Sequence, residues 1–214
     1  MVKENECIEL KEFKDIDFSS SQRFQLMIKY FFDRVLAMFF LILLFPLFLI
    51  ISFLIVLDDG WPVFFVQERT GLKGKVFKMY KFRTFKVFQE NKDIHTYKDD
   101  PRITRFGRFL RETSLDELPQ LINILLGQMS FVGPRPNLPE QYEKLNEIQK
   151  QRTLIKPGIT GLAQINGRNT IPWEKRIYYD LIYIKNFSLL LDIFILYKTV
   201  FVVLKKEGVW QEKN

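Results

Sequence analysis

Two adjacent carboxylates, Asp116 and Glu117, are the residues whose types and spacing point most directly to chemistry. They follow Ser114 and precede an apolar run, residues 118–125, that ends before Gly127. A serine N-cap with a glutamate three residues later is the pattern of a capping box, so we predict that a helix begins here. Asp116 would lie in its first turn, where free N–H groups and the helix dipole favour an ionised carboxylate. The same pair also fits an ordinary helix start, which is the commoner use of such residues.

Arginines recur at the glycine- and proline-rich turns of the chain. Arg111 lies just before the carboxylate pair, Arg135 lies between two prolines in GPRP, and Arg168 lies in NGRN. Arginine is well suited to bidentate phosphate contacts, although most single arginines are solvated surface residues. Lys81 and Arg83 add a basic face to a predicted strand, so these five cations are the candidate substrate-binding residues. Together with the carboxylates they indicate phosphate chemistry with a divalent cation or a carboxylate nucleophile.

The composition excludes other kinds of site. One cysteine, Cys7, and one histidine, His95, exclude a disulfide framework and argue against a Cys/His zinc site. The formal net charge of +7 calls for acidic partners, which are nucleic acid, an anionic bilayer surface or a phosphorylated substrate. The 22 phenylalanines crowd near one apolar segment, which favours a membrane over nucleic acid.

Residues 35–57 carry no charged side chain. As a helix they would measure about 34 Å, enough to cross a hydrocarbon core of about 30 Å. Pro46 lies in the middle and favours a kink, and basic residues flank both ends, whereas a single span carries them mainly on its cytoplasmic side. The segment is therefore predicted either to bend at Pro46 and leave by the face it entered, or to be a single span with an N-terminal tail outside.

These patterns predict a mostly helical α+β fold that is associated with a membrane. Strands are expected at residues 63–67 and 76–85 in a small hairpin, and helices at 102–111, 139–151, 173–186 and 188–206. The last helix is apolar but interrupted by charges, as in helices that lie on headgroups. The patterns divide the chain into a polar leader (1–22), the membrane segment with its flanks (23–59), a basic domain that includes the interfacial C-terminal helix (60–206) and a polar tail (207–214).

Three blocks of the chain, residues 67–85, 100–136 and 156–169, resemble the monotopic phosphoglycosyl transferases, or bacterial sugar transferases. The blocks occur in the family's order, and the length matches the small members that consist of the catalytic core. NGRN followed by IPWEKR is most similar to the members that transfer phospho-N,N′-diacetylbacillosamine or a related N-acetylated amino sugar.

The resemblance implies that residues 23–59 are a re-entrant membrane helix and that residues 60–206 are a cytoplasmic catalytic domain. It also implies a two-step reaction at the cytoplasmic face of the bacterial inner membrane. Asp116 would attack the β-phosphate of a UDP-sugar and release UMP, and undecaprenyl phosphate would then take the phosphosugar. Glu117 would be the second catalytic carboxylate and a Mg²⁺ ligand, and Arg111, Arg135 and Arg168 match the family's basic positions. The implied partners are the UDP-sugar, undecaprenyl phosphate and membrane phospholipid, with no nucleic acid. The oligomeric state stays open, a dimer included.

One departure from the family lies at the membrane bend, where Phe45-Pro46 replaces the frequent Ser-Pro. A serine hydroxyl can satisfy backbone groups freed by proline and phenylalanine cannot, so we expect a shallower bend or other partners for the carbonyls. Two other functions fit the residues alone. They are a membrane-anchored basic binding module, and a nucleotide-sugar hydrolase with Asp116 as the base.

Overall fold

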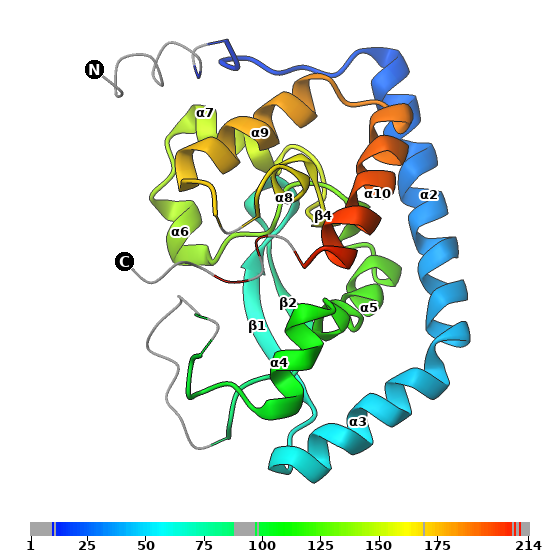
Figure 1. Cartoon of the computed structure of the whole chain (residues 1–214). Helices are drawn as coiled ribbons and strands as arrows, with labels where there is room; N and C mark the ends of the chain where they lie inside the picture. Colours follow the sequence, from blue (N-terminus) through cyan, green and yellow to red (C-terminus); the bar gives the residue numbers. More distant parts are fainter. Residues whose placement is uncertain are drawn as a thin grey trace.

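The computed structural model describes residues 10, 12–87, 97, 99–168, 170–206, 208 and 210. Cys7, His95, residues 1–9 and 11 of the predicted leader, and most of the predicted tail lie outside these residues. Two helices, α2 (Ser20–Leu43) and α3 (Phe45–Asp59), run along one side of the molecule, and the other helices and two small sheets pack against them (Figure 1). The predicted mostly helical α+β class is confirmed.

Helices α2 and α3 meet at a sharp bend. Their axes differ by 62° across a break at Leu44, and Pro46 lies in the first turn of α3. The Leu44 N–H still donates to the Phe40 carbonyl at 2.8 Å, and the Phe48 N–H donates to the Leu44 carbonyl at 2.9 Å. Phe45 is therefore compatible with a large change of direction. In the part of the chain that the structure describes, no helix alone has the length and apolarity to cross a bilayer, but the bent pair together does.

The predicted hairpin is confirmed. Strands β1 (Phe64–Thr70) and β2 (Val76–Phe82) pair antiparallel, and a short 3-10 turn, η1 (Leu72–Gly74), joins them. The register sets Phe64 opposite Phe82, where the two rings stack.

A second pair of strands was not predicted. β3 (Ser130–Val132) and β4 (Gly158–Thr160) pair in parallel. A Cβ on Gly158 would lie 2.1 Å from the Gly133 nitrogen, and one on Gly161 would lie 2.3 Å from the Gly133 oxygen, so the backbones approach closely because side chains are absent. Three-residue strands are too short for a readable alternation, which is why the sequence indicated only turns here.

The other helices follow the predictions unevenly. The predicted helices at 173–186 and 188–206 are confirmed as α9 (Trp173–Lys185) and α10 (Leu189–Leu204). The basic helix starts later than predicted, as α4 (Arg105–Glu112), and the polar helix 139–151 is divided into shorter pieces. The remaining elements are η2 (Leu115–Glu117), α5 (Gln120–Leu125), α6 (Pro139–Glu143), α7 (Glu147–Lys150), η3 (Gln151–Thr153) and α8 (Leu162–Ile165).

Both arms of the bent helix pair pack on the same body of the molecule. The inner face of α2 meets α5 and β2 through Ala37, Leu121 and Met79. The inner face of α3 meets α4 and β2 through residues that include Ile51 and Leu110. The burial of these side chains fixes both arms against one core.

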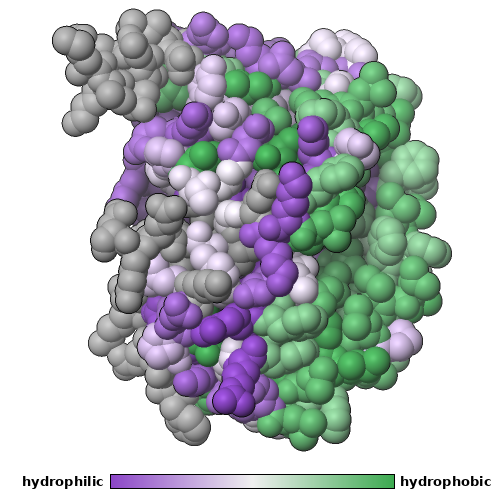
Figure 2. All heavy atoms as spheres, in the orientation of Figure 1, coloured by the Kyte–Doolittle hydropathy of each residue, from purple (hydrophilic) through white to green (hydrophobic). Residues whose placement is uncertain are grey.

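The outer faces of the same helices are apolar and exposed. Figure 2 shows apolar side chains gathered over the side on which α2 and α3 lie, whereas hydrophilic ones are frequent elsewhere. We call this the apolar face, and its exposed members on α2, α3 and α10 include Phe24, Met27, Phe31, Phe39, Ile42, Leu43, Phe45, Leu49, Phe53, Leu57, Leu190, Ile193, Tyr197, Val200 and Leu204. A patch of this extent marks a surface that contacts an apolar partner or a membrane.

Candidate active site

The backbone at the carboxylate pair differs from the predicted capped helix. Ser114 has φ 58°, in the left-handed region, and its side chain caps nothing. Asp116 and Glu117 belong to the single 3-10 turn η2, and α5 starts only after Pro119. The predicted capping box is therefore wrong. The physical reason is that the Glu117 side chain takes charged partners in place of a backbone N–H, and such charge-assisted bonds are stronger.

Glu117 is held by two cations from different elements. Its Oε1 accepts from Lys81 Nζ of β2 at 2.7 Å and from Arg135 Nη2, in the loop after β3, at 2.9 Å. The Glu117 side chain is only 15% exposed. Burial acts to raise the pKa of Glu117, but Arg135 and Lys81 together outweigh it and hold that pKa well below its usual range. Glu117 is thus an ionised carboxylate with a fixed position.

Asp116 directly precedes Glu117 in the chain, but its side chain has a different environment. It is buried, and among the described residues no hydrogen bond reaches its carboxylate. Burial raises the pKa of Asp116, Glu117 adds to the rise, and Lys81 and Arg111 act against it. The sequence led us to expect that a helix start would favour the charged form, whereas the raised pKa runs the other way. A carboxylate pair with divergent pKa values is a common feature of sites that divide chemical roles between two acids.

Two further cations from the predicted set lie near the pair. The Arg111 Nε donates to Thr84 Oγ1 at 2.8 Å, and the guanidinium lies 4.4 Å from the centre of the Phe85 ring. Arg168 has a left-handed backbone, with φ 50°. Its Nη2 lies 3.5 Å from the Oγ of Ser114, which is the residue before η2. Four of the five predicted basic residues therefore surround the carboxylate pair: Lys81, Arg111, Arg135 and Arg168.

Arg83 is the exception, and its predicted role in substrate binding needs correction. Its guanidinium pairs with Asp59 Oδ2 at 2.5 Å and donates to the carbonyls of Gly60 and Pro62. It therefore binds the C-terminal end of α3, where free carbonyls favour a cation. The prediction assumed that Arg83 shares one face of the strand with Lys81. Strand β2 ends at Phe82, so Arg83 lies just beyond the strand and need not follow its alternation.

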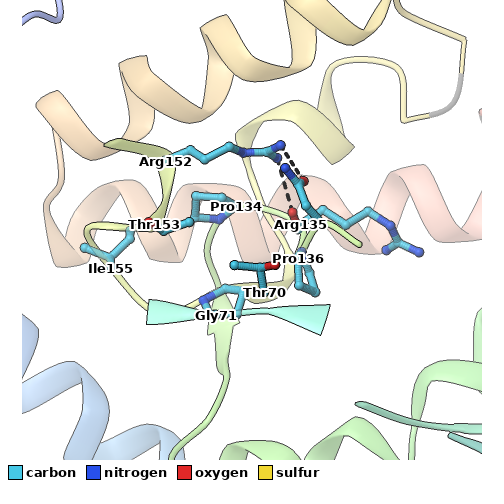
Figure 3. A pocket seen from close by; sticks show the side chains of 10 residues that line it. Thr70, Gly71, Pro134, Arg135, Pro136, Arg152, Thr153 and Ile155 are labelled. Atoms are coloured by element: carbon cyan, nitrogen blue, oxygen red, sulfur yellow. Dashed lines mark hydrogen bonds between the residues drawn. The ribbon is translucent and has the colours of Figure 1, made fainter. Parts of the chain in front are cut away.

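Arg152 is a residue of this region that the sequence did not single out. It lies in η3 with a side chain 4% exposed, pairs with Asp180 of α9, and donates to the side chain of Asn137. Its Nη2 also donates to the Arg135 carbonyl at 3.2 Å. Figure 3 shows the Arg152 guanidinium directed at the backbone around Arg135, whose own side chain extends away from it. Arg152 thus supports the loop that presents Arg135, and only its burial reveals this, since its sequence context is an ordinary polar segment.

The residues at the pair fit one kind of Mg²⁺ site. Among the described residues there is no cluster of three or more Asp, Glu, His or Cys side chains that could hold a metal. Mg²⁺ commonly takes one or two carboxylates and completes its shell with water and substrate phosphates. Glu117 Oε2 and the Asp116 carboxylate have no hydrogen bonds within the described part of the chain, so hard oxygen donors are available. The donor set fits a cation that arrives with a phosphorylated substrate, and not a site made of protein ligands alone.

Comparison with known proteins finds relatives over most of the chain. A model of the family described as bacterial sugar transferase matches residues 24–206. Over 189 residues the chain is 45% identical to "Uncharacterized sugar transferase EpsL" of Bacillus subtilis, covering 88% of this chain and 93% of the relative. It is 47% identical over 178 residues to the UDP-glucose:undecaprenyl-phosphate glucose-1-phosphate transferase of Klebsiella pneumoniae, and 41% identical over 196 residues to the undecaprenyl-phosphate galactose phosphotransferase of Salmonella typhimurium.

The chain belongs to the bacterial sugar transferase family. The predicted class of enzyme, a phosphoglycosyl transferase, is confirmed by the names of these relatives. The alignments cover 79% and 84% of this chain but only 38% and 41% of the Klebsiella and Salmonella proteins, so the chain spans less than half the length of these relatives and nearly all of EpsL.

Proposed function

We propose that the chain transfers a sugar 1-phosphate from a UDP-sugar to undecaprenyl phosphate through a phosphosugar bound covalently to Asp116. An Asp116 oxygen forms a bond to the β-phosphorus while the bond from that phosphorus to the bridging oxygen breaks, and UMP leaves. An oxygen of the lipid phosphate then attacks the same phosphorus, which frees Asp116 and yields a lipid-linked diphosphosugar. The observation that carries the proposal is the division within the pair: Glu117 is held by two cations, whereas Asp116 is buried and unengaged.

The basic residues answer the main obstacle to this chemistry. A carboxylate and a diphosphate repel each other, so the negative charge must be offset before the two can approach. The Arg135 side chain is 48% exposed and extends from a stiffened turn, so it can bind phosphate oxygens while it still contacts Glu117. Lys81 of β2 and Arg168 of the turn after α8 also lie near the pair. Mg²⁺, held by Glu117 and the substrate phosphates, would supply additional charge neutralisation when bound.

We place the protein in the bacterial cytoplasmic membrane as a re-entrant, monotopic enzyme with its catalytic domain on the cytoplasmic side. The 62° bend and the exposed apolar face of α2 and α3 support this arrangement. The packing supports it further, because both helices bury their inner faces on the same body of the molecule. A straight span would carry α3 away from that body. Membrane phospholipids would then cover the apolar face.

A short motif bears on the identity of the donor sugar. NGRN followed by IPWEKR led to the prediction of an N-acetylated amino sugar, and this stays a prediction. The names of the Klebsiella and Salmonella relatives refer to glucose and galactose. UMP release from a panel of UDP-sugars, measured with and without undecaprenyl phosphate, would identify the preferred donor.

The covalent step is tested with a UDP-sugar labelled at the β-phosphorus with ³²P. Without lipid acceptor, the wild type should release UMP once and retain the label on the protein, and addition of undecaprenyl phosphate should move the label to lipid. Asp116→Asn should abolish both, with a loss of about a thousandfold or more. Glu117→Gln, of similar shape, should slow both steps but leave some label.

Two results would contradict the proposal. UMP release with the labelled phosphosugar always in solution would indicate a nucleotide-sugar hydrolase in which Asp116 acts as a base. Binding of the UDP-sugar without any release of UMP, unchanged in Asp116→Asn, would indicate a basic binding module.

A further inference from the structure

An apolar cavity lies between the helix bend and the carboxylate pair. Its volume is about 230 Å³. Six apolar side chains and two polar residues line it: Phe40, Leu44, Leu118, Leu121, Phe131, Ile159, Ser114 and Glu117. The cavity therefore has an almost wholly apolar wall with its polar groups at the carboxylate pair.

The position of the cavity connects two surfaces with different partners. Phe40 and Leu44 come from the end of α2 and the break that follows it, where the neighbouring Phe39 and Leu43 are 55% and 57% exposed on the apolar face. Glu117 belongs to the proposed catalytic pair and is held by Lys81 and Arg135. A ligand in this cavity would have its apolar part against the helix bend and its other end beside the cations.

We propose that this cavity holds the isoprenyl unit next to the phosphate of the lipid acceptor. This rests on the proposed function, in which the acceptor is a polyprenyl phosphate. Such a lipid carries a branched, unsaturated hydrocarbon directly on its phosphate, which matches an apolar wall that ends at a cluster of cations. A cavity of roughly 150 Å³ can hold a benzene molecule, so this one is large enough for a five-carbon branched unit.

In this arrangement the lipid phosphate lies between the bound isoprenyl unit and the phosphosugar. With its first isoprenyl unit among Phe40, Phe131 and Ile159, the lipid phosphate lies toward Glu117, and therefore toward the phosphosugar on Asp116. The rest of the chain continues past the bend to the apolar face and into the bilayer. A sugar or a nucleotide would leave most of its hydroxyl groups without partners against these walls.

Filling the cavity tests the proposal. Ile159→Trp adds volume from β4, and Phe131→Trp is a milder filler from β3 in case the first variant folds poorly. Leu126→Trp is the matched control, because Leu126 directly follows α5, is 59% exposed and does not line the cavity. Each variant is studied as the full chain in vesicles, with UMP release measured first without acceptor, as a single burst, and then in steady state with undecaprenyl phosphate.

For both cavity-filling variants, Ile159→Trp and Phe131→Trp, we expect the ratio of acceptor-dependent turnover to burst rate to fall about tenfold or more. The KM for undecaprenyl phosphate should rise. Leu126→Trp should stay within about threefold of the wild-type ratio. An unchanged ratio in both cavity-filling variants would overturn the inference, and so would an equal loss in Leu126→Trp. Absence of a burst in the wild type would instead contradict the proposed covalent function, so the two failures are distinguishable.

Discussion

Asp116 and Glu117 are neighbours in the chain, but their side chains differ in what they can do. Glu117 is fixed by Lys81 and Arg135, which lower its pKa despite its burial. Asp116 lacks such bonds among the described residues, and burial raises its pKa. The nearby cations oppose this rise, so the charge state of Asp116 depends on them. This makes Lys81 a residue that acts on both members of the pair.

A change at Lys81 should therefore be visible in the pH dependence of UMP release. Asp116 must be ionised to attack, so activity is lost as the pH falls through its pKa, which burial raises above the ordinary 3.8. Lys81→Met removes a charge that lowers this pKa, so the acidic limb should move to higher pH by about one unit. The rate of the first burst, followed across the acidic range, measures the shift.

Lys81→Arg is the matched control for this shift, since it keeps the positive charge. Its acidic limb should stay close to that of the wild type even if its maximum rate is lower. An acidic limb that does not move in Lys81→Met would mean that Asp116 is not the group that titrates.

At the scale of the elements, the loop after β3 depends on support from a distant part of the chain. Arg152 of η3 bonds the Arg135 carbonyl and the Asn137 side chain, and it pairs with Asp180 of α9. Burial raises the pKa of Asp180 to about 6 despite the guanidinium beside it. The buried ion pair therefore connects α9 to the turn that presents Arg135.

Two variants separate the structural and positioning roles of Arg152. Arg152→Met leaves Asp180 buried without its partner and should lower the free energy of unfolding by about 3–5 kcal/mol. The double variant Arg152→Met, Asp180→Leu removes both charges and should recover most of that loss. The Arg135 turn stays unsupported in the double variant, so kcat/KM for the UDP-sugar should remain about tenfold or more below wild type.

Thermal unfolding in detergent and steady-state UMP release measure the two effects in parallel. Full recovery of activity in the double variant would show that Arg152 acts only on stability. An Arg152→Lys variant should regain part of both quantities, because it keeps the charge but not the planar fork that reaches three acceptors.

At the scale of the whole molecule, α2 and α3 have exposed apolar outer faces, and their inner faces form walls of the domain. Buried polar residues fasten α2 to the domain: Lys29 pairs with Asp192 of α10 at 2.5 Å, and Asp33 accepts from Ser130 of β3 at 2.6 Å. Tyr183 of α9 also donates to Asp192 at 2.6 Å. These contacts place the start of α2 on the same body as the end of α3, which Arg83 binds through Asp59.

The proposed re-entrant topology predicts that both ends of the bent pair face the same side of the membrane. In a Cys7→Ser background, Ser21→Cys at the start of α2 and Lys75→Cys in the turn of the hairpin, both exposed, report on the two ends. A membrane-impermeant maleimide should label both in inverted vesicles and neither in intact spheroplasts. Labelling in detergent controls for reactivity. If Ser21→Cys is labelled from the periplasmic side, the helix pair spans the membrane and the re-entrant topology is wrong.

The sequence by itself determined the parts that depend on local pattern and composition. The uncharged run around Pro46, the alternation in the hairpin and the apolar stretches of α9 and α10 are local features, and the corresponding elements were predicted. Residue types at a predicted helix start, on a predicted strand and at glycine- and proline-rich turns also indicated the carboxylate pair and the four cations that the structure places around it. The three family blocks added the reaction that such a set could perform.

Only the tertiary structure decided how these residues are used. The Glu117 side chain could cap a backbone or pair with cations, and the choice depended on Lys81 and Arg135, which are distant in sequence. Arg83 binds the end of α3 through Asp59, and Arg152 is buried in a pair with Asp180. Asp192 is buried in a pair with Lys29, whereas the sequence indicated a helix that lies on headgroups. In each case the partner comes from another part of the chain, so the bonds that a charged side chain makes, and the pKa that results, follow from packing and cannot be read from neighbouring residues.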